Sequence, residues 1–324
     1  MMRMPMAHLC RHAIWMVVIA LALTFLFWRS GFDFDYVIPR RLARLAAMLI
    51  GGVCIAWSSI AFQTLTGNRI LTPAIMGYEA VYLLLQSLLI LVMGTQSLVV
   101  LGTNGNFVLS VALLLGYSWA IHRWLLRDGR NNVYFLLLLG LVLTMVIGTV
   151  TQFVQLRISP GEFAHLLGFS QASFAKAQPG QLLAAAALVA AVCLAGLKTL
   201  PTLDVLALGR DQAMSLGVDY QRTVRRTLAL IAVLIAVLVA VSTSLLGPTA
   251  FMGIFVANTA YALARSFRHR VTLPTGCAIA IGIFILAQLA VEHVFNYRTT
   301  VGILVNLVCG AWFLALMVRT RGTA

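Results

Sequence analysis

Long apolar runs, separated by short polar segments, are the dominant pattern along the chain. Most of these runs have the length of a helix that crosses a bilayer, which needs about 20 mainly apolar residues. They cover residues 13–28, 42–62, 72–93, 104–122, 133–155, 181–199, 227–246, 251–265, 273–292 and 300–318. The pattern predicts an all-α membrane protein with about ten transmembrane helices.

Composition supports the same environment. Hydrophobic residues make up 61% of the chain, charged residues only 10%, and the mean hydropathy is +0.96. A compact monomer of this composition could not present a sufficiently polar surface to water, so lipid is the expected solvent. The predicted helices occupy most of the 324 residues, and we expect residues 1–324 to form a single transmembrane domain.

The net charge of +14 does not indicate a nucleic-acid protein, because the cationic residues lie between apolar runs rather than on one face. With a cytoplasmic N-terminus, 16 of the 23 Lys and Arg residues fall on the inner side. The positive-inside rule then predicts a multi-pass protein of the bacterial inner membrane with both termini in the cytoplasm. The first run ends at Phe27-Trp28-Arg29 without a small-residue cleavage site, so we expect it to be retained.

Two connections are longer than simple turns. Residues 156–180 are predicted to face the periplasm, and residues 200–222 the cytoplasm. Long ordered loops in compact proteins often carry function, although a plain surface loop is the alternative for each.

Catalytic signatures are missing from the sequence. Lys176 and Lys198 are the only lysines and neither follows glycine, so no phosphate-binding loop ending in Gly-Lys-Ser/Thr is present. The six histidines and five cysteines show no metal-ligand spacing. The sequence therefore predicts neither an enzyme nor a metal site, and a non-catalytic membrane protein is expected.

Glu79 is the acidic residue that stands out within an apolar run, and Gln86 follows seven residues later on the same helical face. One interpretation is a polar stripe that faces a transport pathway or a partner helix. The other is a protonated or water-bonded carboxyl group near the start of the helix.

A cytoplasmic segment carries the clearest resemblance to a known family. Residues 206–218 read Leu-Ala-Leu-Gly-Arg-Asp-Gln-Ala-Met-Ser-Leu-Gly-Val, which resembles the LxLGxxxAxxLGV segment of FecCD permeases from siderophore and cobalamin ABC importers. The resemblance implies short helices that dock on an ATPase; the alternative is an amphipathic loop lying on the membrane surface. The coupling residues it implies are Leu206, Leu208, Gly209, Arg210, Asp211, Gln212, Ala213, Leu216 and Gly217.

Three further segments are similar to the family. Residues 68–77 resemble its NPLAxPxxLG turn at the inner channel mouth, and residues 41–44 resemble its RLPR motif, whose arginines bind glutamates of the periplasmic protein. Residues 246–258 resemble GPIGFVGLIVPH in a variant that suggests the catecholate or mixed-ligand siderophore branch. The predicted channel residues are Gln63, Asn68, Ile70, Pro73, Glu79 and Gln86, and the predicted docking residues are Arg41, Arg44 and Arg298. Membrane-interface anchoring is the alternative role of Arg41 and Arg44.

The resemblance implies the permease fold of type II ABC importers. Its partners would be a dimer of ATP-binding subunits, a second permease of the same or homologous sequence, and a periplasmic siderophore-binding protein. The cargo would be ferric siderophore, with no cofactor held by this chain and with ATP used by the partner. Alternatives are a cobalamin or haem permease, an ion-coupled secondary transporter, and a scaffold.

Overall fold

The computed structural model describes residues 4–31, 33–94, 97–127, 133–174, 178–208, 225–249 and 251–321. These parts of the chain are helices joined by short connections. The helices are α1 (Met4–Phe27), α2 (Val37–Thr66), η1 (Pro73–Met76), α3 (Tyr78–Met93), α4 (Ser97–Arg127), α5 (Val133–Gln155), α6 (Pro160–Ser170), α7 (Pro179–Leu197), α8 (Leu200–Leu206), α10 (Arg225–Leu246), α11 (Met252–Ala264), α12 (His269–His293) and α13 (Val301–Arg321).

The predicted all-α class is confirmed, and each of the ten predicted runs falls on a helix. Five helical segments in the described residues are long and apolar enough to span a membrane: Val37–Thr66, Leu101–Ile121, Leu138–Gln155, Pro179–Leu197 and His269–His293. Five shorter apolar segments lie in α1, α3, α10, α11 and α13. The chain is therefore a multi-pass membrane protein.

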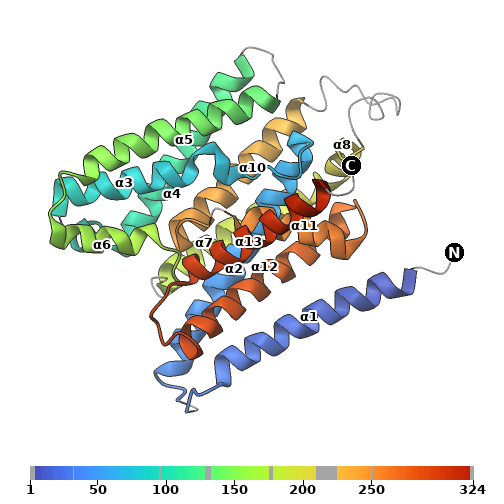
Figure 1. Ribbon diagram of the computed structural model, residues 1–324, viewed down its shortest axis with the longest axis horizontal. Coiled ribbons are helices and arrows are strands. Elements are labelled where there is room, and N and C mark those ends of the chain that lie inside the picture. The colour runs from blue at the N-terminus through green and yellow to red at the C-terminus, as the bar shows by residue number, and fades with distance from the viewer. Residues whose placement is uncertain are drawn as a thin grey trace.

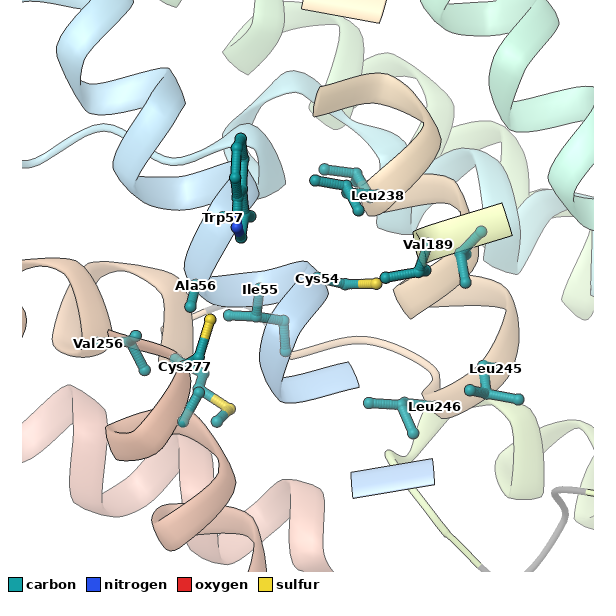
Figure 2. Packing of buried hydrophobic residues seen from close by; sticks show 14 of the residues in the cluster. Cys54, Ile55, Ala56, Trp57, Val189, Leu238, Leu245, Leu246, Val256 and Cys277 are labelled. Atoms are coloured by element: carbon teal, nitrogen blue, oxygen red, sulfur yellow. The ribbon is translucent and has the colours of Figure 1, made fainter. Parts of the chain in front are cut away.

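Helix α2 lies at the centre of the bundle, packed against α12, α10, α11 and α7 (Figure 1). Figure 2 shows how its side chains point to both sides: Cys54 approaches Val189 of α7, while Ala56 lies near Val256 and Cys277. Because several helices pack around it, most of α2 beyond its first turns is apolar on more than one side rather than along a narrow stripe.

Small residues allow α2 to approach its neighbours closely. A Cβ atom added to Gly52 would lie 3.1 Å from the backbone nitrogen of Ile281 in α12. A Cβ atom added to Gly196 of α7 would lie 2.7 Å from the Trp57 ring. Membrane helices commonly associate through such small residues, because lipid gives no hydrophobic drive for helix pairing.

Different elements lie at the two ends of the bundle. The start of α1, the end of α13 and α8 lie toward one end, and the α1–α2 and α12–α13 turns lie toward the other (Figure 1). Within the predicted outer loop, residues 160–170 fold as α6, whose first turn is capped by Ser159. The Ser159 hydroxyl accepts a hydrogen bond from the Glu162 N–H and donates one to the Glu162 carboxylate.

Candidate transport site

The connection between α2 and η1, residues 67–72, is termed here the channel-mouth turn. It begins at Gly67, which ends α2 with a φ of 62°. The Asn68 carboxamide oxygen accepts a hydrogen bond from the Ile70 N–H at 2.9 Å, which closes an Asx turn. This local bond holds the turn although Arg69 occupies the place of the family's first proline. Ile70 is exposed at the tip of the turn, with 42% of its surface accessible.

Side chains from two helices hold the Arg69 carbonyl group in this turn. The Gln63 side-chain amide of α2 donates to the Arg69 oxygen at 2.7 Å, and the Asn258 amide of α11 donates to the same oxygen at 2.9 Å. The structure therefore brings predicted residues Gln63, Asn68 and Ile70 together, with Pro73 just beyond them at the start of η1. Asn258 had no predicted role, and nothing in the local sequence indicates that it reaches this turn.

Glu79 lies in the first turn of α3, where its carboxylate accepts a hydrogen bond from the Thr249 N–H at 2.7 Å. It lines a polar cavity of about 30 Å³, together with Ser58, Ser59, Thr72, Ser242 and Thr243. The hydroxyl oxygen of Thr72 is buried there without a hydrogen-bond partner. Such a volume and such a lining suit an ordered water molecule that satisfies these groups.

Gln86 is directed to a different neighbour. It is buried, and its amide donates to Asn106 at 3.1 Å and to Ser110 at 3.2 Å, both in α4. The residues lining the Glu79 cavity do not include Gln86. The structure therefore separates the two predicted polar residues into distinct polar networks.

A larger cavity of about 520 Å³ lies between α4, α6, α7 and the end of α10. Its polar lining is mainly neutral and includes Asn106, His165, Gln171, Gln178 and Gln181. Part of this lining comes from the predicted outer loop 156–180. Amide groups of this kind can donate to or accept from a neutral polar group.

At the opposite end of the bundle from α8, Arg41 and Arg44 share one carboxylate. Arg44 Nη1 lies 3.0 Å from Glu292 Oε1, and Arg41 Nη2 lies 3.8 Å from Glu292 Oε2. Arg41 also donates to the carbonyl oxygens of Phe25 and Trp28, at 2.5 and 2.8 Å. These predicted docking residues are therefore engaged within the chain.

Other arginines near these turns are more accessible. Arg298 and Arg40 are both exposed, and the Arg40 guanidinium lies over the Tyr36 ring at 3.9 Å. Glu292 was not predicted as a site residue, although it lies at the end of a predicted run. An acidic residue in such a position needs a cationic partner, and this requirement is the signal that points to Arg41 and Arg44.

The predicted coupling loop begins with α8. Leu200 and Leu203 are buried, whereas Leu206 is half-buried and Leu208 is 50% exposed. Asp204, the residue after Leu203, contacts His269 at the start of α12 and accepts a hydrogen bond from its backbone N–H. The other predicted coupling residues, Gly209, Arg210, Asp211, Gln212, Ala213, Leu216 and Gly217, lie outside the described part of the chain.

Comparisons with known proteins assign the family. The model of the FecCD transport family matches residues 8–319. The petrobactin import permease YclO of Bacillus subtilis is 33% identical over 91% of this chain and 92% of its own length. The petrobactin import permease FatC of Bacillus anthracis is 32% identical over 89% of this chain and 80% of its own.

A more distant relative and a solved structure agree. The hemin permease HmuU of Yersinia pestis is 29% identical over 87% of this chain and 82% of its own length. A metal-chelate type ABC transporter in an inward-facing conformation superposes with a TM-score of 0.81, at 17% identity, over 96% of this chain and 99% of that one. That superposition shows the fold. The family match, which spans nearly the whole sequence, shows that the chain belongs to the FecCD transport family.

Proposed function

We propose that this chain is the membrane permease of an ABC importer that moves a ferric siderophore from the periplasm to the cytoplasm. The observation that carries the proposal is the FecCD match across residues 8–319, joined to full-length relatives that are permeases of siderophore importers. A petrobactin-type ferric siderophore is the first cargo to test, because two of these relatives are named for petrobactin.

The arrangement of the chain supports a pathway with an inner mouth. The channel-mouth turn, with Asn68 and Ile70, would form a constriction there. The passage itself would lie between two permease subunits, since a ferric siderophore is bulky. Glu79 would contribute a polar group to each half, whereas Gln86, buried against α4, would support the helix packing beside the passage. The siderophore already fills the coordination sphere of iron, so this chain need not supply metal ligands.

Energy would come from a separate pair of ATPase subunits. In our proposal they dock beneath the coupling loop 200–222, and their closure on ATP moves α8 and opens one side of the channel. Exposed Leu208 offers an apolar contact to such a partner. The chain would hold no ATP site and no cofactor of its own.

A loaded periplasmic protein would dock at the outer rim, near Arg41, Arg44 and Arg298. Since Arg41 and Arg44 share Glu292, a glutamate of the partner would have to compete with this internal carboxylate for them. Arg298 is exposed, so a partner glutamate could approach it without displacing Glu292. Both termini would lie in the cytoplasm, on the inner side of the bacterial inner membrane.

The rival function is an ion-coupled secondary transporter, which needs ionisable groups along its own pathway. Among the described residues, Glu79 is the acid that lines a polar cavity within the bundle. A Glu79→Gln variant that loses uptake, combined with uptake that needs no ATPase, would favour the rival. The family match does not favour it.

Gly209→Pro tests the proposed function most sharply at this loop. The substitution stiffens the segment predicted to dock on the ATPase, so ATPase association and uptake of labelled ferric petrobactin should both fall. Gly129→Pro, in the predicted cytoplasmic loop between the runs 104–122 and 133–155, is the matched control and should retain both. Unchanged association and uptake with Gly209→Pro would contradict the coupling assignment.

A further inference from the structure

A short series of hydrogen bonds connects α8 to the inner end of α2 through one histidine. The Asp204 carboxylate accepts from the His269 backbone N–H at 2.7 Å and contacts the His269 ring nitrogen Nδ1 at 2.6 Å. On the other side of the ring, Nε2 lies 2.8 Å from the Thr64 hydroxyl oxygen. We call these three residues the Asp204–His269–Thr64 bridge.

His269 is the central member, and its side chain is only 1% exposed. The contact between Nδ1 and the Asp204 carboxylate oxygen has hydrogen-bond length, and a protonated ring nitrogen there would donate to the carboxylate. The Asp204 carboxylate also satisfies one of the free N–H groups in the first turn of α12. His269 thus contacts two helices at once. Its backbone N–H and Nδ1 contact Asp204 of α8, and its Nε2 contacts Thr64 of α2.

From Thr64 the contacts continue to the channel-mouth turn. The Thr64 hydroxyl lies 3.4 Å from the Tyr261 hydroxyl, and the Arg69 guanidinium lies over the Tyr261 ring at 5.2 Å. Thr64 is adjacent in sequence to Gln63, whose amide holds the Arg69 carbonyl. Asp204 and Arg69 are therefore linked by contiguous contacts although 135 positions separate them in the sequence.

A bridge of this kind constrains how the helices can move. A hydrogen bond is directional, and its loss is costly where the group is buried, as the His269 ring is, whereas the Asp204 side chain is 33% exposed. Displacement of α8 relative to α12 and α2 must break the bridge or carry those helices along. The bridge lies at the base of the predicted coupling loop, where such a displacement would begin.

We infer that Asp204 and His269 are positioning residues that transmit movement of α8 to the inner end of α2 and the channel-mouth turn. This inference rests on the proposed function, because it needs an ATPase that moves the coupling loop. Nothing in the local sequence around either residue indicates the pairing. The competing explanation is that Asp204 merely caps α12 and stabilises the fold.

The test measures coupling separately from assembly. The full importer, with its ATPase and binding protein, is reconstituted in proteoliposomes with wild-type, Asp204→Asn, His269→Gln or Thr64→Val permease. Three quantities are recorded: the amount of ATPase bound, the rate of ATP hydrolysis, and the labelled ferric petrobactin imported per ATP. Thr275→Val is the matched control, because Thr275 is buried in α12 and, within the described part of the chain, its hydroxyl bonds only the Val271 carbonyl one turn earlier.

The bridge predicts that Asp204→Asn and His269→Gln keep ATPase binding and hydrolysis but lower import per ATP by about five-fold or more, the lower range of a typical coupling energy. Combining the two should be no worse than either alone, since both break the same link. Thr64→Val should lower import per ATP by a smaller factor, and Thr275→Val should leave it unchanged. If the Asp204 variant fails to assemble, the nearly isosteric Thr64→Val variant tests the inference in its place.

Unchanged import per ATP in assembled Asp204→Asn, His269→Gln and Thr64→Val complexes would overturn the inference. So would a parallel fall of protein yield, hydrolysis and import, which is the pattern of a purely structural cap. Wild-type complexes that import no ferric siderophore with ATP would instead contradict the proposed function and remove the basis of the inference. The wild-type arm therefore distinguishes the two failures.

Discussion

Arg44 and Glu292 form an ion pair across the bundle, with Nη1 of Arg44 lying 3.0 Å from Oε1 of Glu292. The two residues are 248 positions apart and join the first part of α2 to the last turn of α12. The Gln288 amide donates to the same carboxylate at 2.6 Å, and the Glu292 side chain is only 4% exposed. This carboxylate therefore organises the predicted outer end of the bundle.

Replacing Glu292 with Gln should destabilise the protein, because Arg41 and Arg44 would lose their shared anion. Loss of one partner from a fully buried pair costs about 3–5 kcal/mol. The Arg44 side chain is 27% exposed, so water can solvate its charge after Glu292 is lost. We therefore expect the free energy of unfolding to fall by about 1–3 kcal/mol. The melting temperature of the purified permease in detergent measures the effect. Glu162→Gln, whose carboxylate binds a serine hydroxyl, is the control, and equal melting temperatures for the two variants would contradict this account.

Docking of the binding protein should depend on exposed cations. Arg298→Glu should slow association of the periplasmic protein with permease complexes in nanodiscs, because a charge at an interface rim acts mainly on the association rate. The difference from wild type should shrink as salt is raised. Arg265→Glu, an exposed arginine near the predicted inner end, should leave association unchanged. An association rate for Arg298→Glu that equals wild type at low salt would remove Arg298 from the docking surface.

Gly77 occupies a conformation that a side chain disfavours. Its φ is +86°, and an added Cβ atom would lie 2.7 Å from the Tyr117 hydroxyl oxygen and 3.1 Å from that of Thr144. Gly77→Ala should therefore lower the free energy of unfolding by about 1–3 kcal/mol, measured by thermal unfolding. Gly148→Ala is the control, since the residue is in α5 and a Cβ atom there would meet no side chain or other helix of the described residues within 4 Å. A Gly77→Ala protein as stable as Gly148→Ala would show that the turn tolerates a side chain.

Most helices could be predicted because each apolar run is a local feature of the sequence. The bilayer sets its length, and short polar connections mark its ends. Pairings between runs could not be predicted in this way. Asp204 and His269 are 65 positions apart, and the hydropathy pattern assigns each to a helix end without saying which helices pack together.

The candidate site was predicted in part for the same reason. Gln63, Asn68 and Ile70 lie within one short segment, so the turn they form is encoded locally. Asn258 reaches this turn from α11, and only the packing of α11 on α2 brings it there. Glu79 and Gln86 share a helical face by periodicity, yet Glu79 contacts Thr249 in the connection after α10, whereas Gln86 contacts α4.

The predicted orientation can be tested by labelling single cysteines in a cysteine-free background. Leu208→Cys should react with a membrane-impermeant maleimide only in inside-out vesicles, because its exposed side chain belongs to the predicted cytoplasmic loop. Val294→Cys, which is 71% exposed after α12, should react only in right-side-out vesicles. The opposite pattern would invert the topology and place the coupling loop on the wrong side for an ATPase.

This permease is expected to import its cargo with energy from a separate ATPase. The most direct measurement is accumulation of labelled ferric petrobactin by proteoliposomes that contain the permease, its ATPase and its binding protein. We predict accumulation against a gradient only when all three proteins and ATP are present, and none with a proton or sodium gradient alone. Accumulation by the permease without the ATPase, driven by an ion gradient, would contradict the account.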